Sequence, residues 1–113
     1  MITNKQTAQH YTWGANCDSW VMVDTPDLSV KQELMPVGTK EQLHSHEKAQ
    51  QFFFILKGTA TFYLDGKKET VSAQQGITIV AKTKHYIANE SNTELEFLVT
   101  SQPSTNNDRI NHG

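Results

Sequence analysis

Cysteine is almost absent from this chain of 113 residues, which contains Cys17 alone. A single cysteine cannot form a disulfide within the chain, and it excludes paired-cysteine zinc and redox motifs. Proteins without disulfides are typical of reducing compartments. The first residues are polar and include no apolar segment of the signal-peptide type. We therefore expect a cytoplasmic protein in which Cys17 is a small buried residue.

Long apolar runs and an excess of either charge are missing as well. No stretch approaches the roughly 20 apolar residues that a membrane-spanning helix needs. Ten basic and twelve acidic residues leave a formal net charge of −2. Binding to nucleic acid or to an anionic membrane normally needs a clustered positive charge. We expect neither nucleic acid nor a membrane as a partner.

Patterns typical of helices are also scarce. Short segments rich in β-branched and aromatic residues alternate with turn residues, as in all-β sandwiches and barrels. Strands are expected over residues 19–24, 28–35, 51–57, 59–64, 71–72, 77–81, 85–89 and 94–100. Asp65-Gly66 is the strongest hairpin signal, because this pair favours a two-residue turn between strands.

The chain length favours one domain over residues 1–113, with a barrel core at about 19–101. Residues 1–10 could dangle or add an edge strand. Residues 102–113 contain one clear apolar residue, Ile110, so we expect a loosely ordered polar tail. The only arginine, Arg109, is expected to form a surface ion pair; carboxylate binding at the mouth of a barrel is the alternative.

Histidine carries the main chemical signal of the sequence. His44 and His46 are one residue apart, so in an extended strand they point to the same face. Gln51 follows, and a third histidine, His85, comes after a later glycine turn. Imidazole is the commonest metal ligand and suits zinc, copper, iron and nickel. Donors from several strands could therefore surround one divalent metal ion.

The spacing of these residues resembles the two motifs of the cupin superfamily. The first motif is matched by Gly38-x5-His44-x-His46-x4-Gln51-x6-Gly58, and the second, less well, by Gly76-x8-His85-x3-Asn89. The resemblance covers about residues 19–101. It implies a small single-domain cupin, which is a single antiparallel β-barrel of the double-stranded β-helix (jelly-roll) type. It also implies a metal ion inside the barrel, held by His44, His46, Gln51 and His85.

Gln51 is the one departure within the first motif, because cupins normally carry glutamate there. A neutral amide leaves one more positive charge on the site, which should polarise a bound carbonyl more strongly and lower the pKa of bound water. The same charge should disfavour a trivalent oxidised metal. The His-His-Gln-His set is similar to that of the small cupin that opens unsaturated uronate rings. We expect one divalent ion, with zinc, nickel or manganese favoured and iron also allowed.

Three functions remain open at this stage. The leading one is a metal-dependent enzyme of the isomerase or lyase type, in which the ion acts as a Lewis acid on a small oxygen-rich substrate such as a sugar or uronate derivative. The second is a three-histidine iron dioxygenase in which Gln51 does not ligate. The third is a non-catalytic sensor or small-ligand-binding protein. A general acid or base could come from Glu33, Glu41 or Tyr63. Glu33 shares its strand face with Lys31 and Met35, which indicates a solvent face.

Residues near the metal on neighbouring strands should line the pocket. If Gln51 faces the ion, then Phe53 and Ile55 share its face because strand side chains alternate. Tyr63 and Ile87 are further candidates for the pocket wall.

Both faces of the strand after Gln51 are apolar. Phe52, Phe54 and Leu56 would point outward, where a lone barrel would expose them. Exposed apolar rows of this kind often mark partner surfaces, so we expect a homodimer.

Overall fold

The computed structural model describes residues 1–113 and is built from strands and loops without helices. The eleven strands are β1 (Gln9–Trp13), β2 (Cys17–Asp24), β3 (Ser29–Met35), β4 (His44–Ser45), β5 (Gln50–Lys57), β6 (Thr59–Leu64), β7 (Lys67–Ser72), β8 (Gly76–Ile79), β9 (His85–Ala88), β10 (Leu95–Gln102) and β11 (Ile110–Asn111). No helix has the length and apolar character needed to cross a bilayer.

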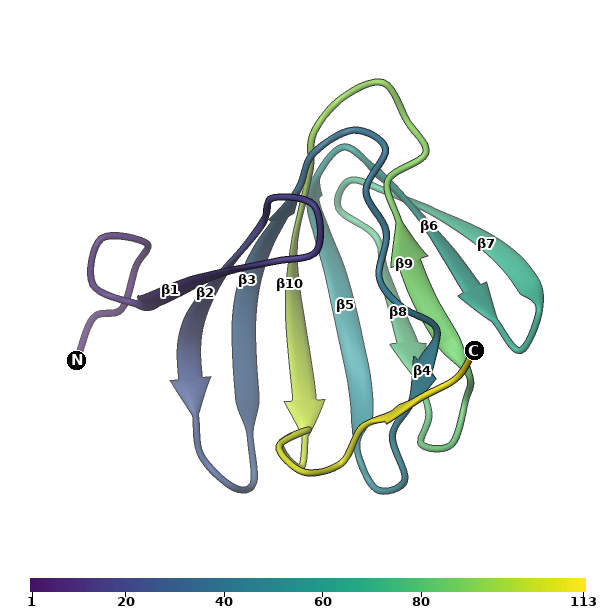
Figure 1. Ribbon diagram of the computed structural model, residues 1–113. Helices are drawn as coiled ribbons and strands as arrows, with labels where there is room; N and C mark the ends of the chain where they lie inside the picture. Colours follow the sequence, from purple (N-terminus) through teal and green to yellow (C-terminus); the bar gives the residue numbers. More distant parts are fainter.

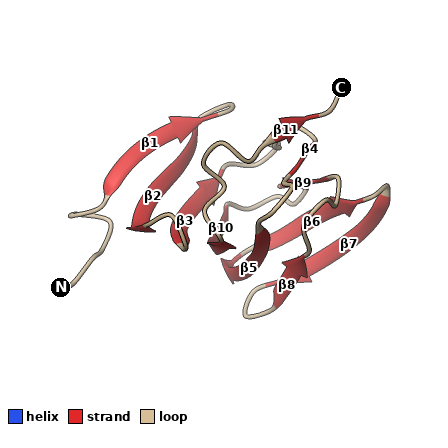
Figure 2. Ribbon diagram, turned by 90° about the horizontal axis from the view of Figure 1, so that it is seen from below, coloured by secondary structure: helices blue, strands red, loops and turns tan.

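The strands form two antiparallel sheets that curve around a common interior (Figures 1 and 2). One sheet has six strands in the order β1-β2-β3-β10-β5-β8, and the other has five in the order β11-β4-β9-β6-β7. In each sheet, strands that are distant in sequence lie side by side, in the runs β3-β10-β5-β8 and β11-β4-β9-β6, which is typical of the double-stranded β-helix. The expected all-β fold is confirmed, although no ladder of hydrogen bonds joins the two sheets into a closed barrel.

Local turn chemistry determines two of the connections. Asp65 and Gly66 both have positive φ, 49° and 84°, and link β6 to β7 as the expected hairpin. Gly58 separates β5 from β6 with φ 86°. A Cβ atom at Gly58 would lie 2.4 Å from the main-chain oxygen of Glu94, so glycine is required there.

The hydrophobic core fills the space between the sheets. The rings of Phe62 and Phe97 lie 5.0 and 5.5 Å from that of Phe53, which is 3% exposed. The expected alternation along β5 is confirmed, because Gln51, Phe53 and Ile55 are buried while the intervening side chains face outward.

Strand β3 presents the opposite face from the one expected. Ser29, Glu33 and Met35 are buried, whereas Val30 and Leu34 are only half-buried on the outer side. The inner face of β3 lines a polar cavity at one end and the apolar core at the other. Alternation therefore marks two faces here, but the polar face is the inner one, and the expected solvent position of Glu33 is wrong.

Both ends of the chain are part of the sheets. Residues Gln9–Trp13 form the edge strand β1, one of the two options left open for the N-terminal segment. The expectation of a loosely ordered tail is wrong, because β11 pairs with β4 and the tail crosses the histidine strand (Figure 1). Polar and main-chain hydrogen bonds hold this tail, which is why its low hydrophobicity was misleading.

Candidate metal centre

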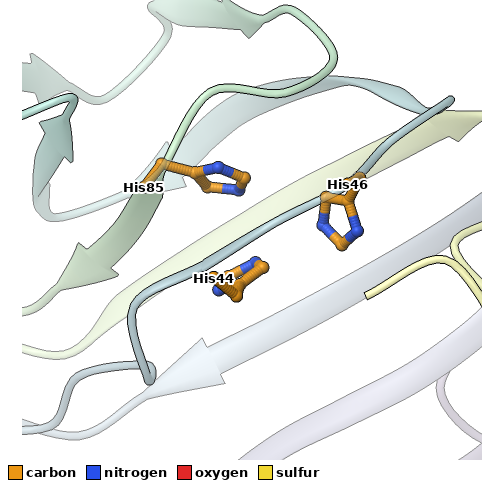
Figure 3. A group of neighbouring side chains, drawn as sticks. All are labelled: His44, His46 and His85. Atoms are coloured by element: carbon orange, nitrogen blue, oxygen red, sulfur yellow. The ribbon is translucent and has the colours of Figure 1, made fainter. Parts of the chain in front are cut away.

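The two histidine motifs meet where β4 lies beside β9. His44 pairs directly with His85 across the two strands, and His46 follows β4 on the same face as His44. One ring nitrogen from each residue lies within 4.8 Å of the other two. Figure 3 shows the three rings around a common space, with centroids 4.3 to 5.6 Å apart. The sequence prediction that these residues come together is therefore met in the structure.

Each imidazole is oriented by a hydrogen bond from its Nδ1 to a main-chain carbonyl. The acceptors are the oxygens of Gln42 at 2.7 Å for His44, Asp108 at 2.6 Å for His46, and Thr83 at 2.8 Å for His85. Because Nδ1 carries the proton, Nε2 of each neutral ring presents a lone pair. Carbonyls that bind the second nitrogen fix the tautomer and raise the basicity of metal-ligating histidines.

All three rings are buried, and burial keeps His44 and His85 in the form that binds metal. His44, His46 and His85 are between 1% and 3% exposed. Burial lowers the pKa of His44 to about 3, although its bond to the Gln42 carbonyl acts in the opposite direction. Burial likewise lowers the pKa of His85 below its usual range. Neutral imidazole is the ligating form, so these two groups need lose no proton near neutral pH.

The side-chain oxygen of Gln51 adds a fourth acceptor to the three histidine nitrogens of the cluster. Its amide nitrogen donates to Ser101 Oγ at 3.1 Å, which turns Oε1 toward the histidines, 3.2 Å from Nε2 of His85. The Nε2 atom of His46 is buried without any hydrogen-bond partner. A buried group of acceptors without donors is unfavourable unless a cation joins it. The residues therefore fit a divalent metal ion of the kind that binds nitrogen and neutral oxygen ligands.

A cavity of about 410 Å³ opens beside this cluster, and His44, His46 and Gln51 form part of its wall. Its size suits a small molecule. The other charged side chains of the wall are Lys31, Glu33, Lys40, Glu41 and Arg109.

Neither carboxyl group of the cavity forms an ion pair; Glu33 is buried and Glu41 is half-buried. Glu41 Oε1 accepts the main-chain N–H of Ile87 at 3.1 Å. Burial, followed by the neighbouring charge of Glu33, raises the pKa of Glu41 to about 7. Burial also raises the pKa of Glu33, against a smaller opposing effect of Ser19. With a pKa of about 7, the carboxyl group of Glu41 can accept or release a proton near neutral pH.

The predicted pocket residues divide into two groups. Phe53 lines the cavity next to Gln51, as its shared strand face indicated. Ile55 and Ile87 lie in the hydrophobic core, 0% and 1% exposed, and are not part of the cavity wall.

Tyr63 lies on the outer face of the five-stranded sheet, so its prediction as a pocket residue is wrong. Its hydroxyl donates to the carboxylate of Glu90 at 2.6 Å, and its ring stacks on Tyr86 with 4.7 Å between centroids. The neighbouring Phe62 fills the core, and alternation along β6 then directs Tyr63 outward.

Several wall residues were not predicted, because they come from the ends of the chain. Tyr11 and Trp13 alternate along the edge strand β1 and reach the cavity, and Nε1 of Trp13 is buried without a partner. Arg109, by contrast, was expected either in a surface ion pair or at the mouth of the barrel; it lies at the cavity, with its Nε donating to Asn111 Oδ1 at 2.9 Å. The alternating aromatic pair in β1 was the available signal for that strand.

Comparison with known proteins identifies one family. A family model described as the cupin domain matches residues 31–101. The uncharacterized protein MJ1618 of Methanocaldococcus jannaschii is 36% identical over 75 residues, which are 66% of this chain and 60% of that protein. An oxalate-binding protein of Thermotoga maritima is 34% identical over 64 residues, which are 57% of this chain and 53% of that protein. The matches thus span little more than half the length of either relative.

Solved structures agree on the fold. A predicted oxalate decarboxylase from Thermotoga maritima superposes with a TM-score of 0.81 and 21% identity, over 92% of this chain and all of that one. A sugar phosphate isomerase from Silicibacter pomeroyi superposes with a TM-score of 0.80 and 15% identity, over 92% of this chain and 76% of that one. At these identities the likeness concerns the fold alone.

Proposed function

The chain belongs to the cupin family, and on this premise we propose that it binds one divalent metal ion and uses it as a Lewis acid on a small oxygen-rich substrate, such as a sugar or uronate derivative. The observation that carries the proposal is the set of three buried histidines. Their Nδ1 atoms are all occupied by main-chain carbonyls, and their remaining nitrogens converge beside a cavity.

His44, His46 and His85 would hold the ion, with the amide oxygen of Gln51 as a fourth ligand. All four are neutral, so the site keeps the full charge of the ion, which favours Lewis-acid over redox chemistry. Zinc, nickel and manganese suit this role best, and iron is also compatible with the histidines. When bound, the ion would polarise a carbonyl or hydroxyl oxygen of the substrate.

The cavity wall provides the other groups that such a reaction needs. Glu41 can hold or move a proton, because burial raises its pKa to about 7, and neither Glu41 nor Glu33 is in an ion pair. The free Nε1–H of Trp13 can donate to a substrate oxygen. Lys40 and Arg109 line the same cavity and can attract an anionic substituent.

The named neighbours support the substrate class without identifying one substrate. A sugar phosphate isomerase and a predicted oxalate decarboxylase share this fold. Sugars, sugar phosphates and oxalate are all small and rich in oxygen. They can therefore be tested side by side.

The test begins with metal analysis of protein purified without added metal. The chelator-stripped protein is then reloaded separately with zinc, nickel, manganese and iron and assayed with unsaturated uronates, ketosugars, sugar phosphates and oxalate. Turnover that depends on a redox-inactive metal without oxygen uptake is expected. Stoichiometric iron with oxygen uptake would instead indicate the three-histidine dioxygenase. An absence of turnover with every metal and substrate would contradict an enzymatic role.

A second candidate is a non-catalytic protein that binds a small dicarboxylate. The 34% identity to an oxalate-binding protein favours it, and the basic residues of the cavity suit such a ligand. This candidate predicts that oxalate raises the melting temperature of the metal-loaded protein while remaining chemically unchanged. Product formation would exclude it.

We further propose that the protein is a homodimer formed through Phe52, Phe54 and Leu56, the outward row of β5. Phe52 is 43% exposed, and its ring lies 6.4 Å from that of Phe54. The cytoplasmic location expected from the sequence stays a prediction.

A further inference from the structure

One residue of the C-terminal segment, Asp108, makes four hydrogen bonds to His46 and to the turn that follows it. Its main-chain oxygen accepts the Nδ1 proton of His46 at 2.6 Å. Its carboxylate accepts three consecutive main-chain N–H groups, those of Glu47 at 2.8 Å, Lys48 at 3.1 Å and Ala49 at 3.0 Å. Asp108 thus bonds to every residue from His46 to Ala49.

These contacts act on the only ligating histidine that has no orienting carbonyl within its own segment. The carbonyls that orient His44 and His85 belong to residues two positions earlier in the chain. The carbonyl that orients His46 is 62 residues away. The carboxylate of Asp108 holds the turn after His46 and keeps its own carbonyl over the imidazole. The orientation of His46 therefore depends on the tail.

The rest of the segment fastens Asp108 in place. Asn111 and Ile110 pair with His44 and Ser45 in the β11–β4 ladder, and His112 Nε2 lies 2.8 Å from Ser45 Oγ. The main-chain N–H of Asp108 donates to Thr105 O at 3.0 Å, which forms a turn. The tail is bound on both sides of Asp108.

We propose that Asp108 is a positioning residue for the metal centre, which orients His46 through its main-chain carbonyl and fixes the adjoining turn through its carboxylate. The proposal rests on the proposed metal site. Groups that orient a ligand from outside the coordination sphere commonly change metal affinity 10- to 100-fold when they are removed. The C-terminal segment would then determine how tightly the protein keeps its ion.

The test compares Asp108→Ala with Asn106→Ala, a change in the same segment at a side chain that makes no hydrogen bond. Zinc affinity is measured by competition with a chromophoric chelator. Asp108→Ala is expected to weaken zinc binding by about 10- to 100-fold, whereas Asn106→Ala should remain within twofold of wild type. Wild-type zinc affinity in Asp108→Ala would overturn the proposal.

A second measurement on metal-free protein separates positioning from general loss of structure. Nitrogen-15 NMR reports which ring nitrogen of each histidine carries the proton. Asp108→Ala should change the tautomer signal of His46 and leave that of His85, whose Nδ1 bonds to Thr83, unchanged. Equal changes at both rings, or none at His46, would overturn the proposal. If wild-type protein binds none of zinc, nickel, manganese and iron, the proposed function fails, while this measurement still decides whether Asp108 orients His46.

Discussion

Gln51 sets the charge of the proposed metal centre, because the three other ligands are neutral imidazoles. Replacing its amide with a carboxylate keeps the shape of the side chain and adds one negative charge. One oxygen of a glutamate at this position can still face His85, and the other can accept a hydrogen bond from the hydroxyl group of Ser101. This residue therefore offers the most direct test of the Lewis-acid proposal.

Gln51→Glu is expected to bind zinc roughly tenfold more tightly, because a charged ligand neutralises part of the charge of the ion. It should also lower the turnover number, because the pKa of bound water rises. Calorimetric titration and the activity assay check the two effects. Gln50→Glu is the matched control, because Gln50 is exposed and points away from the site. Unchanged affinity and turnover in Gln51→Glu would place Gln51 outside the coordination sphere.

Glu41 links the electrostatics of the cavity to the stability of the fold. Its pKa is about 7 in the folded protein against an ordinary value of 4.5, so the folded state binds more protons between these two pH values. Stability linked to Glu41 is therefore complete below about pH 4.5 and is lost as the pH rises through about 7. The loss is at most about 3 kcal/mol for a shift of this size.

We expect Glu41→Gln in metal-free protein to be more stable than wild type at pH 8 and to lose this advantage at pH 5. Glutamine keeps an oxygen for the N–H of Ile87 but carries no charge. Urea denaturation at both pH values measures the difference in the free energy of unfolding. Glu69→Gln, on the exposed outer part of β7, controls for the loss of one negative charge. A Glu41→Gln advantage that did not vary with pH would contradict the assignment.

At the scale of the strands, the bend between β5 and β6 depends on a glycine. Gly58 combines φ 86° with a main-chain oxygen where a Cβ atom would lie. Gly38 has a similar φ of 82° but no atom within 4 Å of such a Cβ atom. The two positions therefore separate the cost of the backbone conformation from the cost of the clash.

Gly58→Ala is expected to reduce the free energy of unfolding by roughly 2 to 4 kcal/mol, and Gly38→Ala by about 1 kcal/mol. The larger loss arises because the backbone around Glu94 must move. Chemical denaturation of both variants measures it. Equal losses in the two variants would mean that the main chain at Glu94 moves aside without a measurable cost in stability.

The strands also show which features the sequence could predict. The hairpin at Asp65-Gly66 and the alternation of β5 follow from local rules, so both were predicted. The inner face of β3 was not, because burial of Glu33 depends on a polar cavity that forms only when distant segments pack around it.

The site was predictable to a similar extent. The spacing of the histidines predicted the cluster of His44, His46 and His85, because it matches the two cupin motifs, whose histidines come together at one metal site. The face of Tyr63 could not be predicted, because Phe62 and Tyr63 are both aromatic and the sequence does not show which of the two points inward. Phe62 does, and Tyr63 therefore points outward. The contribution of Asp108 could not be predicted, because polar tails are held by specific hydrogen bonds rather than by hydrophobicity.

At the scale of the whole molecule, the outward face of β5 supports a prediction about assembly. Phe52→Lys places a charge in the proposed dimer interface and should shift wild-type dimers to monomers in sedimentation experiments. Val37→Lys is the control, because Val37 is 54% exposed in a loop outside that row. Circular dichroism checks that both variants fold. Monomeric wild-type protein at micromolar concentration would contradict the dimer.

The crossing of the tail over β4 has a practical consequence for anyone who purifies this protein. The last residues run beside the histidine strand, whereas the N-terminus lies on the side of β1 away from it (Figure 1), and Met1 and Ile2 are exposed. A polyhistidine tag fused after Gly113 would begin beside β4, the strand that carries His44, and would bring further imidazoles close to that strand. Metal content and affinity are best measured with an N-terminal tag that is cleaved before analysis.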